Sequence, residues 1–162
     1  MTAEYRSVQT RMWREDDWFQ ELPTDARLLF IYLFTNPSAS IAGIYRLPLR
    51  TIEFESGIPV ERVKVLLDDF SKANKAHYDS GVVWVVRMRE NQLPGKSISD
   101  KVKVRLDKDV AAIPDCALKT KYLIHYGYPI DTLSIPSGTE TITDSDTDSD
   151  TDPDTDRAFR PR

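Results

Sequence analysis

Apolar positions in the middle of the chain follow first a strand pattern and then a helix pattern. Residues 41–45 form a short run of β-branched and aromatic side chains broken by a glycine, which predicts a strand. Residues 49–57 predict a short helix with Ile52 and Phe54 as its apolar contacts. Gly57 supplies the C-terminal stop of this helix, because glycine takes the left-handed conformation at no steric cost.

A second helix and a hairpin follow. The helix is predicted to start after Pro59, whose missing N–H is no loss in a first helical turn, and to run to about Asn74. Its apolar face, at 3.6-residue spacing, consists of Val63, Leu66, Leu67 and Phe70. Residues 75–78 and 82–88 then flank the turn signal of residues 79–81, which predicts two paired strands. Two short helices joined by a tight turn and followed by a hairpin predict a winged helix-turn-helix.

Further elements are predicted before this unit. Residues 11–13 predict a short strand, and residues 15–22 a helical turn or two. Thr24 is a favourable N-cap for a helix over residues 26–35. Because that helix is apolar on nearly all sides, we expect it at the centre of the core. It should stop before Pro37, since proline disfavours helical backbone at the preceding residue.

Two more helices are predicted after the hairpin. Ser97 or Ser99 caps the first, which continues to about Ala112. Its apolar row recurs every four residues and consists of Ile98, Val102, Leu106 and Val110. The second restarts at Pro114 and ends at Gly127. Its inward side chains are Leu118, Tyr122, Leu123 and Tyr126. This pair is expected to pack either on the hairpin or on another subunit.

From about Thr132 the apolar periodicity is lost. An aspartate occupies every second position from Asp144 to Asp156. Such a segment has no apolar side chain to bury and repels itself, so it predicts a disordered acidic tail. It also lacks the glycine turn and the closing acidic ligand of a calcium-binding loop.

Together these patterns predict a mainly α fold with a small β wing (α+β). The expected organisation is a winged-helix domain over residues 1–90, a helical extension over residues 91–128 and a disordered acidic tail over residues 129–162. A chain of 162 residues suits one domain with a small addition, and a hydrophobic content of 40% is sufficient for a packed core.

The charge of the chain is unevenly distributed. From Thr139 onward eight acidic residues accompany three arginines, whereas the preceding part holds 18 acidic and 19 basic residues. The net charge of −4 therefore comes from the tail, and the expected folded part is nearly neutral. Bulk charge alone does not make that part a strongly basic nucleic-acid binder.

The sequence favours a non-enzymatic protein without a metal or cofactor. It contains no phosphate-binding loop, nucleophile elbow, zinc-protease motif or dinucleotide-binding glycines. The single Cys116 excludes an internal disulfide, and only two histidines accompany it as metal ligands. No apolar run approaches the ~20 residues of a membrane helix, and the N-terminus carries no signal-peptide pattern, so we expect a cytoplasmic protein without membrane contact.

One candidate surface for DNA is the second helix of the predicted helix-turn-helix. With Val60, Val63, Leu67, Phe70 and Asn74 inward, its outward positions are Glu61, Val65, Asp68 and Lys72. Two acids and a valine suit neither phosphate nor guanine. Arg62 and Lys64 flank this face and, with Lys72, are its candidate contacts to the DNA backbone.

A better candidate surface lies on the helix that follows the hairpin. Lys101, Arg105 and Lys108 are spaced by four and three residues and therefore share one helical face, with Lys96 just before them. Such a stripe is as typical of a solvated helix face as of a phosphate contact. It is nevertheless the part of the chain best suited to contact phosphates.

Three apolar residues are the candidates for self-association of the chain. An outward Val65 favours a protein–protein role for the second helix of the helix-turn-helix. Trp13 and Trp18 stand close together among charged residues and are expected to anchor the N-terminal segment on the core. These three residues are the candidates for a homo-oligomer contact.

Several runs of the sequence occur in the same order as in one protein family. They are residues 11–19 (RMWREDDWF), 26–37 (ARLLFIYLFTNP), 43–45 (GIY), 55–58 (ESGI), 66–74, 78–79, 84–85, 99–102 and 113–123. These runs, and the Asp-Thr repeats after them, resemble phage and prophage replication-initiation proteins. That family comprises replisome organisers with a DnaD-like winged-helix N-terminal domain, and the resemblance covers roughly residues 5–127.

The resemblance implies a non-enzymatic protein of a bacterial host cell that self-associates through its winged helix and binds origin DNA. It also implies a role in delivering a replicative helicase or its loader. Fuller members of the family continue past the acidic linker into a further domain, so we expect either a truncated prophage product or a short form that carries only the oligomerising module.

Two other functions fit the same elements. A winged-helix transcription regulator would share the fold and bind a palindrome tightly, because dimeric readers need symmetric half-sites. A protein-interaction or inhibitor module would instead use the acidic tail to mimic nucleic acid against a basic partner.

Overall fold

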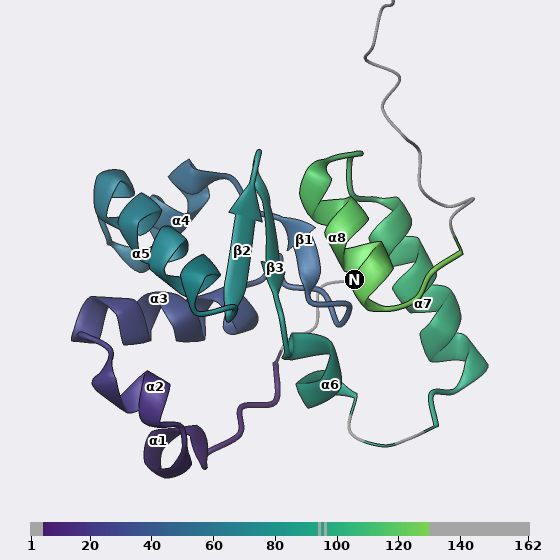
Figure 1. Ribbon diagram of the computed structural model, residues 1–162, viewed down its shortest axis with the longest axis horizontal. Coiled ribbons are helices and arrows are strands. Elements are labelled where there is room, and N and C mark those ends of the chain that lie inside the picture. Colours follow the sequence, from purple (N-terminus) through teal and green to yellow (C-terminus); the bar gives the residue numbers. More distant parts are fainter. Residues whose placement is uncertain (1–4, 94, 96, 130–162) are drawn as a thin grey trace, which may run out of the picture.

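The computed structural model describes residues 5–93, 95 and 97–129 and consists of helices around one small antiparallel sheet (Figure 1). The predicted mainly α fold with a small β component is thereby confirmed. The predicted acidic tail lies outside the described residues from position 130 onward. Among the described helices, none is both long and apolar enough to cross a membrane.

The chain begins with two very short helices, α1 (Met12–Glu15) and α2 (Asp17–Glu21). The strand predicted over residues 11–13 is wrong. A run this short with no neighbouring strand satisfies its backbone groups most readily within a helical turn. Asp16 separates the two helices in extended backbone, and its carboxylate accepts a hydrogen bond from the Phe19 amide (3.2 Å), which caps α2.

Helix α3 (Thr24–Thr35) is buried on one face and not on all sides as predicted. Its buried side chains are Ala26, Leu29 and Leu33. Leu28 is 48% exposed, so the side of the helix that carries it faces solvent. Thr24 is the first residue of the helix, and Pro23 occupies the cap position predicted for Thr24. The fixed φ of proline supplies the extended backbone that a cap requires.

A strand and two helices follow: β1 (Ile44–Arg46), α4 (Leu49–Ser56) and α5 (Val60–Lys72). Gly57 ends α4 with φ of +72°, as predicted from its position. The Glu53 carboxylate accepts a hydrogen bond from the Val60 amide (2.8 Å) and so ties the end of α4 to the start of α5. This bond supplies the side-chain acceptor that the cap residue of α5, a proline, does not have.

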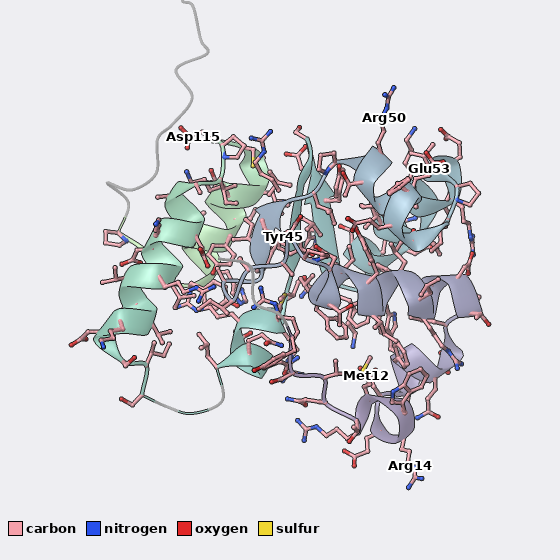
Figure 2. The ribbon with its side chains drawn as sticks, turned by 180° about the vertical axis from the view of Figure 1, so that it is seen from behind. Met12, Arg14, Tyr45, Arg50, Glu53 and Asp115 are labelled. Carbon is pink, nitrogen blue, oxygen red and sulfur yellow. The ribbon has the colours of Figure 1, made fainter. Side chains whose placement is uncertain are left out.

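Phe54 was expected to be an apolar contact of α4, and this prediction is wrong. Its side chain is 89% exposed, whereas Ile52 on the same helix is fully buried. The two positions are separated by about 200° around an α-helix, so only one of them can face the core. Arg50, one turn before Phe54, also projects away from the body of the protein (Figure 2).

The hairpin consists of β2 (Ala76–Asp79) and β3 (Val82–Val85). Ser80 and Gly81 join the strands with φ of +50° and +80°, the backbone that a tight two-residue hairpin loop demands. β3 ends before the predicted residue 88, because its partner β1 begins at Ile44 opposite Trp84. A short helix, α6 (Met88–Gln92), starts instead.

The sheet has the order β1-β3-β2, and both of its pairings are antiparallel. Its central strand is buried on both faces: Val83 and Val85 belong to the core formed with α3, α4 and α5. Val82 and Trp84 belong to a second core.

That second core is formed by α7 (Asp100–Ala111) and α8 (Ala117–His125), which lie together on the opposite side of the sheet from α3–α5 (Figure 1). The buried residues that the two helices contribute are Leu106, Val110, Leu118, Tyr122 and Leu123. The helical pair therefore packs on the sheet, one of the two positions left open by the sequence.

A buried polar contact joins the end of α3 to β1. Asn36 is the one buried polar residue among the described positions, and its Nδ2 donates to the Tyr45 hydroxyl (2.9 Å). That hydroxyl in turn donates to the Leu33 carbonyl. Burial raises the pKa of Tyr45 above its ordinary value, so the hydroxyl keeps its proton for this bond. Tyr45 lies at the centre of the protein in Figure 2.

Gly43 is required where β1 passes the start of α6. It has φ of +76°, and a Cβ added there would lie 3.1 Å from both the Val85 carbonyl oxygen and the Met88 Cβ. We predict that Gly43→Ala lowers the free energy of unfolding by about 2–4 kcal/mol, through left-handed backbone strain and overpacking combined. Urea denaturation followed by circular dichroism measures this change.

Gly81→Ala is the matched control for that substitution. Gly81 has a similar φ of +80°, but no atom lies within 4 Å of an added Cβ. Only the backbone strain of about 1–2 kcal/mol is expected there. Equal losses at the two positions would show that the close approach at Gly43 does not matter.

Candidate nucleic-acid interface

The arginine of α5 is committed to an ion pair within the protein. Arg62 Nε lies 2.6 Å from Asp25 Oδ2 on α3, and a second guanidinium nitrogen lies 3.3 Å from the other carboxylate oxygen. The bond to Arg62 lowers the pKa of the Asp25 carboxyl, and the same bond raises the pKa of Arg62. A guanidinium held at two of its three nitrogens has fewer donors free for phosphate.

The two lysines of α5 are also paired. Lys64 Nζ lies 2.9 Å from a Glu61 oxygen, and Lys72 Nζ lies 2.5 Å from Asp68 Oδ2. All four side chains are largely exposed, so each pair is weak and screened by salt. Even so, the acids cancel the positive potential that α5 would present to DNA.

The facing of α5 follows the sequence prediction at most positions. Glu61, Val65 and Asp68 are exposed, and the predicted apolar face is buried apart from Val60, which is half-buried. Asn74, predicted to face inward, is exposed. The helix ends at Lys72, and Asn74 adopts a left-handed backbone with φ of +53°.

Helix α7 presents a different surface. Lys101, Arg105 and Lys108 are exposed on the side of α7 turned away from the buried Leu106 and Val110; we call these three residues the α7 stripe. Within the described part of the chain, no carboxylate forms an ion pair with any of the three. Lys96, the fourth predicted contact of this surface, lies outside the described residues.

The neighbours of the α7 stripe leave its cations available. Val104, which neighbours Lys101 and Lys108 on the surface of α7, is 68% exposed and brings no charge. Lys103 lies on another flank of α7 and pairs with Asp100 at 3.2 Å, so this acid is directed away from the stripe. A face with three exposed cations, none of them ion-paired with an acid among the described residues, is suited to successive phosphates of a nucleic acid.

Arg6 adds a further cation that the sequence analysis did not single out. Its guanidinium donates to the Ala39 carbonyl, and it lies close enough to Arg105 for the two positive charges to act on each other. Burial, and after it the charge of Arg105, lowers the pKa of Arg6. No local pattern predicts this placement, because the segment around Arg6 has no periodicity and reaches α7 only through the fold.

Asp109 partly offsets these charges at one edge of the stripe. Burial raises the pKa of its carboxyl above the usual range, while Arg105 and Arg6 act in the opposite direction. One of its oxygens is buried and has no hydrogen-bond partner among the described residues. This edge of α7 is therefore less favourable for phosphate than the face formed by Lys101, Arg105 and Lys108.

The position of α7 depends on how α8 is fixed to the sheet. The Tyr122 hydroxyl, buried in the second core, donates to the Ala42 carbonyl at 2.8 Å. The Tyr122 ring meets the Trp84 ring edge to face, with centroids 5.6 Å apart. The Tyr126 hydroxyl, just after α8, lies within hydrogen-bond distance of the Val86 carbonyl (3.3 Å) and of a Glu90 carboxylate oxygen (2.9 Å). These contacts hold α8, and with it α7, against β1 and β3.

The three candidate residues for self-association differ in exposure. Trp18 is half-buried between the rings of Phe30 and Phe70, with centroids at 5.0 and 5.6 Å, so it anchors the N-terminal segment as expected. Trp13 and Val65 are about half exposed, at 51% and 50%. Phe54, which was assigned to the interior, is more exposed than any of them.

The described residues also line an open pocket of about 530 Å³ beside the N-terminal helices. Its lining includes Trp18, Phe30 and Met88 and charged side chains of both signs, among them Arg11 and Glu15. Among the described residues, no three His, Cys, Asp or Glu side chains gather in a way that would hold a metal ion. The mixed charges of the lining select no particular charge on a ligand.

Comparison with protein-family models, with curated proteins and with solved structures finds no match to this chain. The resemblance of residues 5–127 to replication-initiation proteins therefore stays a prediction. What distinguishes one surface from another is the pairing of charges: the cations of α5 have carboxylate partners, and the α7 stripe has none among the described residues.

Removing the Tyr122 hydroxyl tests how α7 is held. Tyr122→Phe keeps the ring contacts but leaves the buried Ala42 carbonyl without its donor, so the free energy of unfolding should fall by about 1–2 kcal/mol. Urea unfolding followed by circular dichroism gives the change. Tyr5→Phe is the control, since Tyr5 is 85% exposed and should change nothing. An unchanged stability of Tyr122→Phe would show that this bond does not hold the helical pair.

Proposed function

We propose that this protein is a non-enzymatic DNA-binding protein of the phage replication-initiation type, which contacts the DNA backbone through the α7 stripe. The observation that carries the proposal is the group of exposed cations Lys101, Arg105 and Lys108, unpaired among the described residues. A surface of this kind binds phosphates by releasing counterions and has no means to read base edges. It suits a protein that assembles on DNA with little sequence preference.

The order of the elements supports a winged helix as the fold of this protein. Helix α3, strand β1, helices α4 and α5 and the β2–β3 hairpin follow the chain order of a helix-turn-helix with a wing, and the strand β3 lies between β1 and β2. In such a fold the second helix of the helix-turn-helix usually enters the major groove. The exposed acids and paired cations of α5 disfavour that use here, which argues against the rival function of a sequence-reading transcription regulator.

Self-association and helicase loading complete the proposed function. The resemblance of several sequence runs to replisome organisers supports a protein that forms a homo-oligomer in the cytoplasm of a bacterial host and contacts a replicative helicase or its loader. The exposed Val65 on α5 and Trp13 on α1 offer apolar area for such contacts.

A protein-interaction module is the second candidate function, and one observation favours it. Phe54 is 89% exposed on α4, where an aromatic ring loses solvent contact only if another molecule covers it. This function predicts complex formation with a protein and no affinity for DNA.

Charge reversal of the stripe tests the proposal. The variant with Lys101→Glu, Arg105→Glu and Lys108→Glu should bind a DNA duplex at least about tenfold more weakly than the native chain. It should also show a flatter dependence on salt, since each lost phosphate contact removes about 0.9 from the slope of log K against log salt. Fluorescence anisotropy of labelled DNA over a salt series measures both quantities.

The matched control carries the same three reversals elsewhere. Arg14, Arg50 and Lys103 are exposed and lie outside the stripe, so Arg14→Glu, Arg50→Glu and Lys103→Glu together change the net charge equally. This variant should lose much less affinity. Equal losses in the two variants would indicate a diffuse electrostatic effect, and undiminished binding by the stripe variant would exclude α7 as the contact.

Val65 provides a separate test of self-association. Val65→Asp places a charge on a half-exposed position, so it should shift the protein to smaller species in sedimentation velocity while its circular dichroism stays native. Val104→Asp is the control at an exposed valine of α7 and should leave the distribution unchanged. If Val65→Asp also leaves it unchanged, α5 is not the interface.

A further inference from the structure

The α7 stripe is unusual among the described helices. On no other described helix do three cations without a carboxylate partner share one face: those of α5 pair with Asp25, Glu61 and Asp68. The remaining helices each carry fewer cations. The stripe is thus the place where an anionic segment would find concentrated positive charge without first displacing an internal partner.

The same chain contains a segment with the complementary charge pattern. Aspartates occupy every second position between Asp144 and Asp156, seven in all. In any extended backbone alternate side chains share one face, at a repeat of about 6.6 Å. Along an α-helix, spacings of four and three residues correspond to rises of about 6 and 4.5 Å. An aspartate row and the α7 stripe are therefore opposite in charge, and the aspartate repeat is close to the spacing between Lys101 and Arg105.

The described part of the chain ends beside α7. Tyr128 packs against the core that contains Leu106 and Val110, and its ring centroid lies 6.4 Å from that of Tyr122. Residues 130–143, between this point and the aspartates, can span up to about 50 Å when extended. Helix α7 has 12 residues and is about 18 Å long, so every part of the stripe is within reach of the aspartates.

We propose that the aspartate row between Asp144 and Asp156 docks on the α7 stripe of its own chain. It thereby occupies the cations Lys101, Arg105 and Lys108 that DNA phosphates require. The docking itself depends only on charge complementarity and tether length, whereas its effect of weakening DNA binding rests on the proposed function.

The strength of such a contact follows from its tether. Exposed ion pairs are individually weak and screened by salt. A short tether, however, raises the effective concentration of the aspartates at α7 to the millimolar range. DNA has a higher density of charge than the aspartate row and therefore displaces the row from the α7 stripe at low salt. The aspartate row thus weakens DNA binding without abolishing it.

Paramagnetic broadening in the full chain tests the docking directly. A nitroxide spin label is attached at Ser149→Cys in a Cys116→Ser background, which leaves one reactive thiol. Serine suits position 116, because Cys116 is the N-cap of α8 and its sulfur accepts a hydrogen bond from the Lys119 amide. We expect the amide signals of α7 to broaden at low salt and to recover in about 1 M salt, where charges beyond about 3 Å are screened.

Three comparisons separate this docking from other causes of broadening. Lys101→Gln, Arg105→Gln and Lys108→Gln together should abolish the broadening, whereas Lys103→Gln should preserve it. Spin-labelled chains mixed with isotope-labelled chains should give no broadening, because the contact lies within one chain. Broadening that spares α7, or that appears only between chains, would overturn the proposal.

DNA binding by a neutralised chain tests the consequence. With all seven aspartates from Asp144 to Asp156 changed to asparagine, affinity for a labelled duplex should rise about tenfold at about 50 mM salt, and the gain should shrink by about 200 mM. Glu140→Gln, a single neutralisation outside the row, should have little effect. Equal affinities of the native and neutralised chains would show that the aspartate row does not weaken DNA binding. Absence of DNA binding in both chains would overturn the proposed function. In that case the paramagnetic broadening would still decide whether the docking occurs.

Discussion

The burial of β3 on both faces is the constraint on which the rest of the described structure depends. Val83 and Val85 face the helices α3–α5, while Val82 and Trp84 face α7 and α8, so a single strand of four residues belongs to both cores. A three-stranded sheet with one open face would leave Trp84 in water. Helices α7 and α8 are needed to cover Trp84. Because α7 is held against this face of the sheet, the direction in which the α7 stripe points is fixed.

Much of the fold could be predicted from local signals in the sequence. The turn at residues 79–81, the stop at Gly57 and the spacing of apolar residues in α5 and α7 each have a physical cause within a few residues. The wrong predictions fall where local signals are weak. The strand predicted over residues 11–13 is too short to show a periodic pattern. The inward position predicted for Phe54 rests only on the apolar character of its side chain. The continuous apolar run of β3 is typical of a strand covered on two sides, but it does not specify what covers it.

The candidate site was less predictable than the fold. The pairs Lys64–Glu61 and Lys72–Asp68 are three or four residues apart, and their effect on α5 can be anticipated from the sequence. The partner of Arg62, Asp25, is 37 positions away on another helix, and Arg6 approaches Arg105 from the other end of the described chain. Whether a cation is free for DNA therefore depends on tertiary contacts, which only the folded arrangement shows.

The bond between Tyr122 and Ala42 spans 80 positions, and this separation has a consequence for synthesis on the ribosome. The strands of the sheet are complete well before α7 and α8 have been translated, so the face that carries Val82 and Trp84 is uncovered for some time. At about 5–20 residues per second this interval lasts a few seconds. A nascent chain that pauses there presents an apolar sheet surface, and the translation rate between β3 and α8 would then influence how much of the protein reaches its native state.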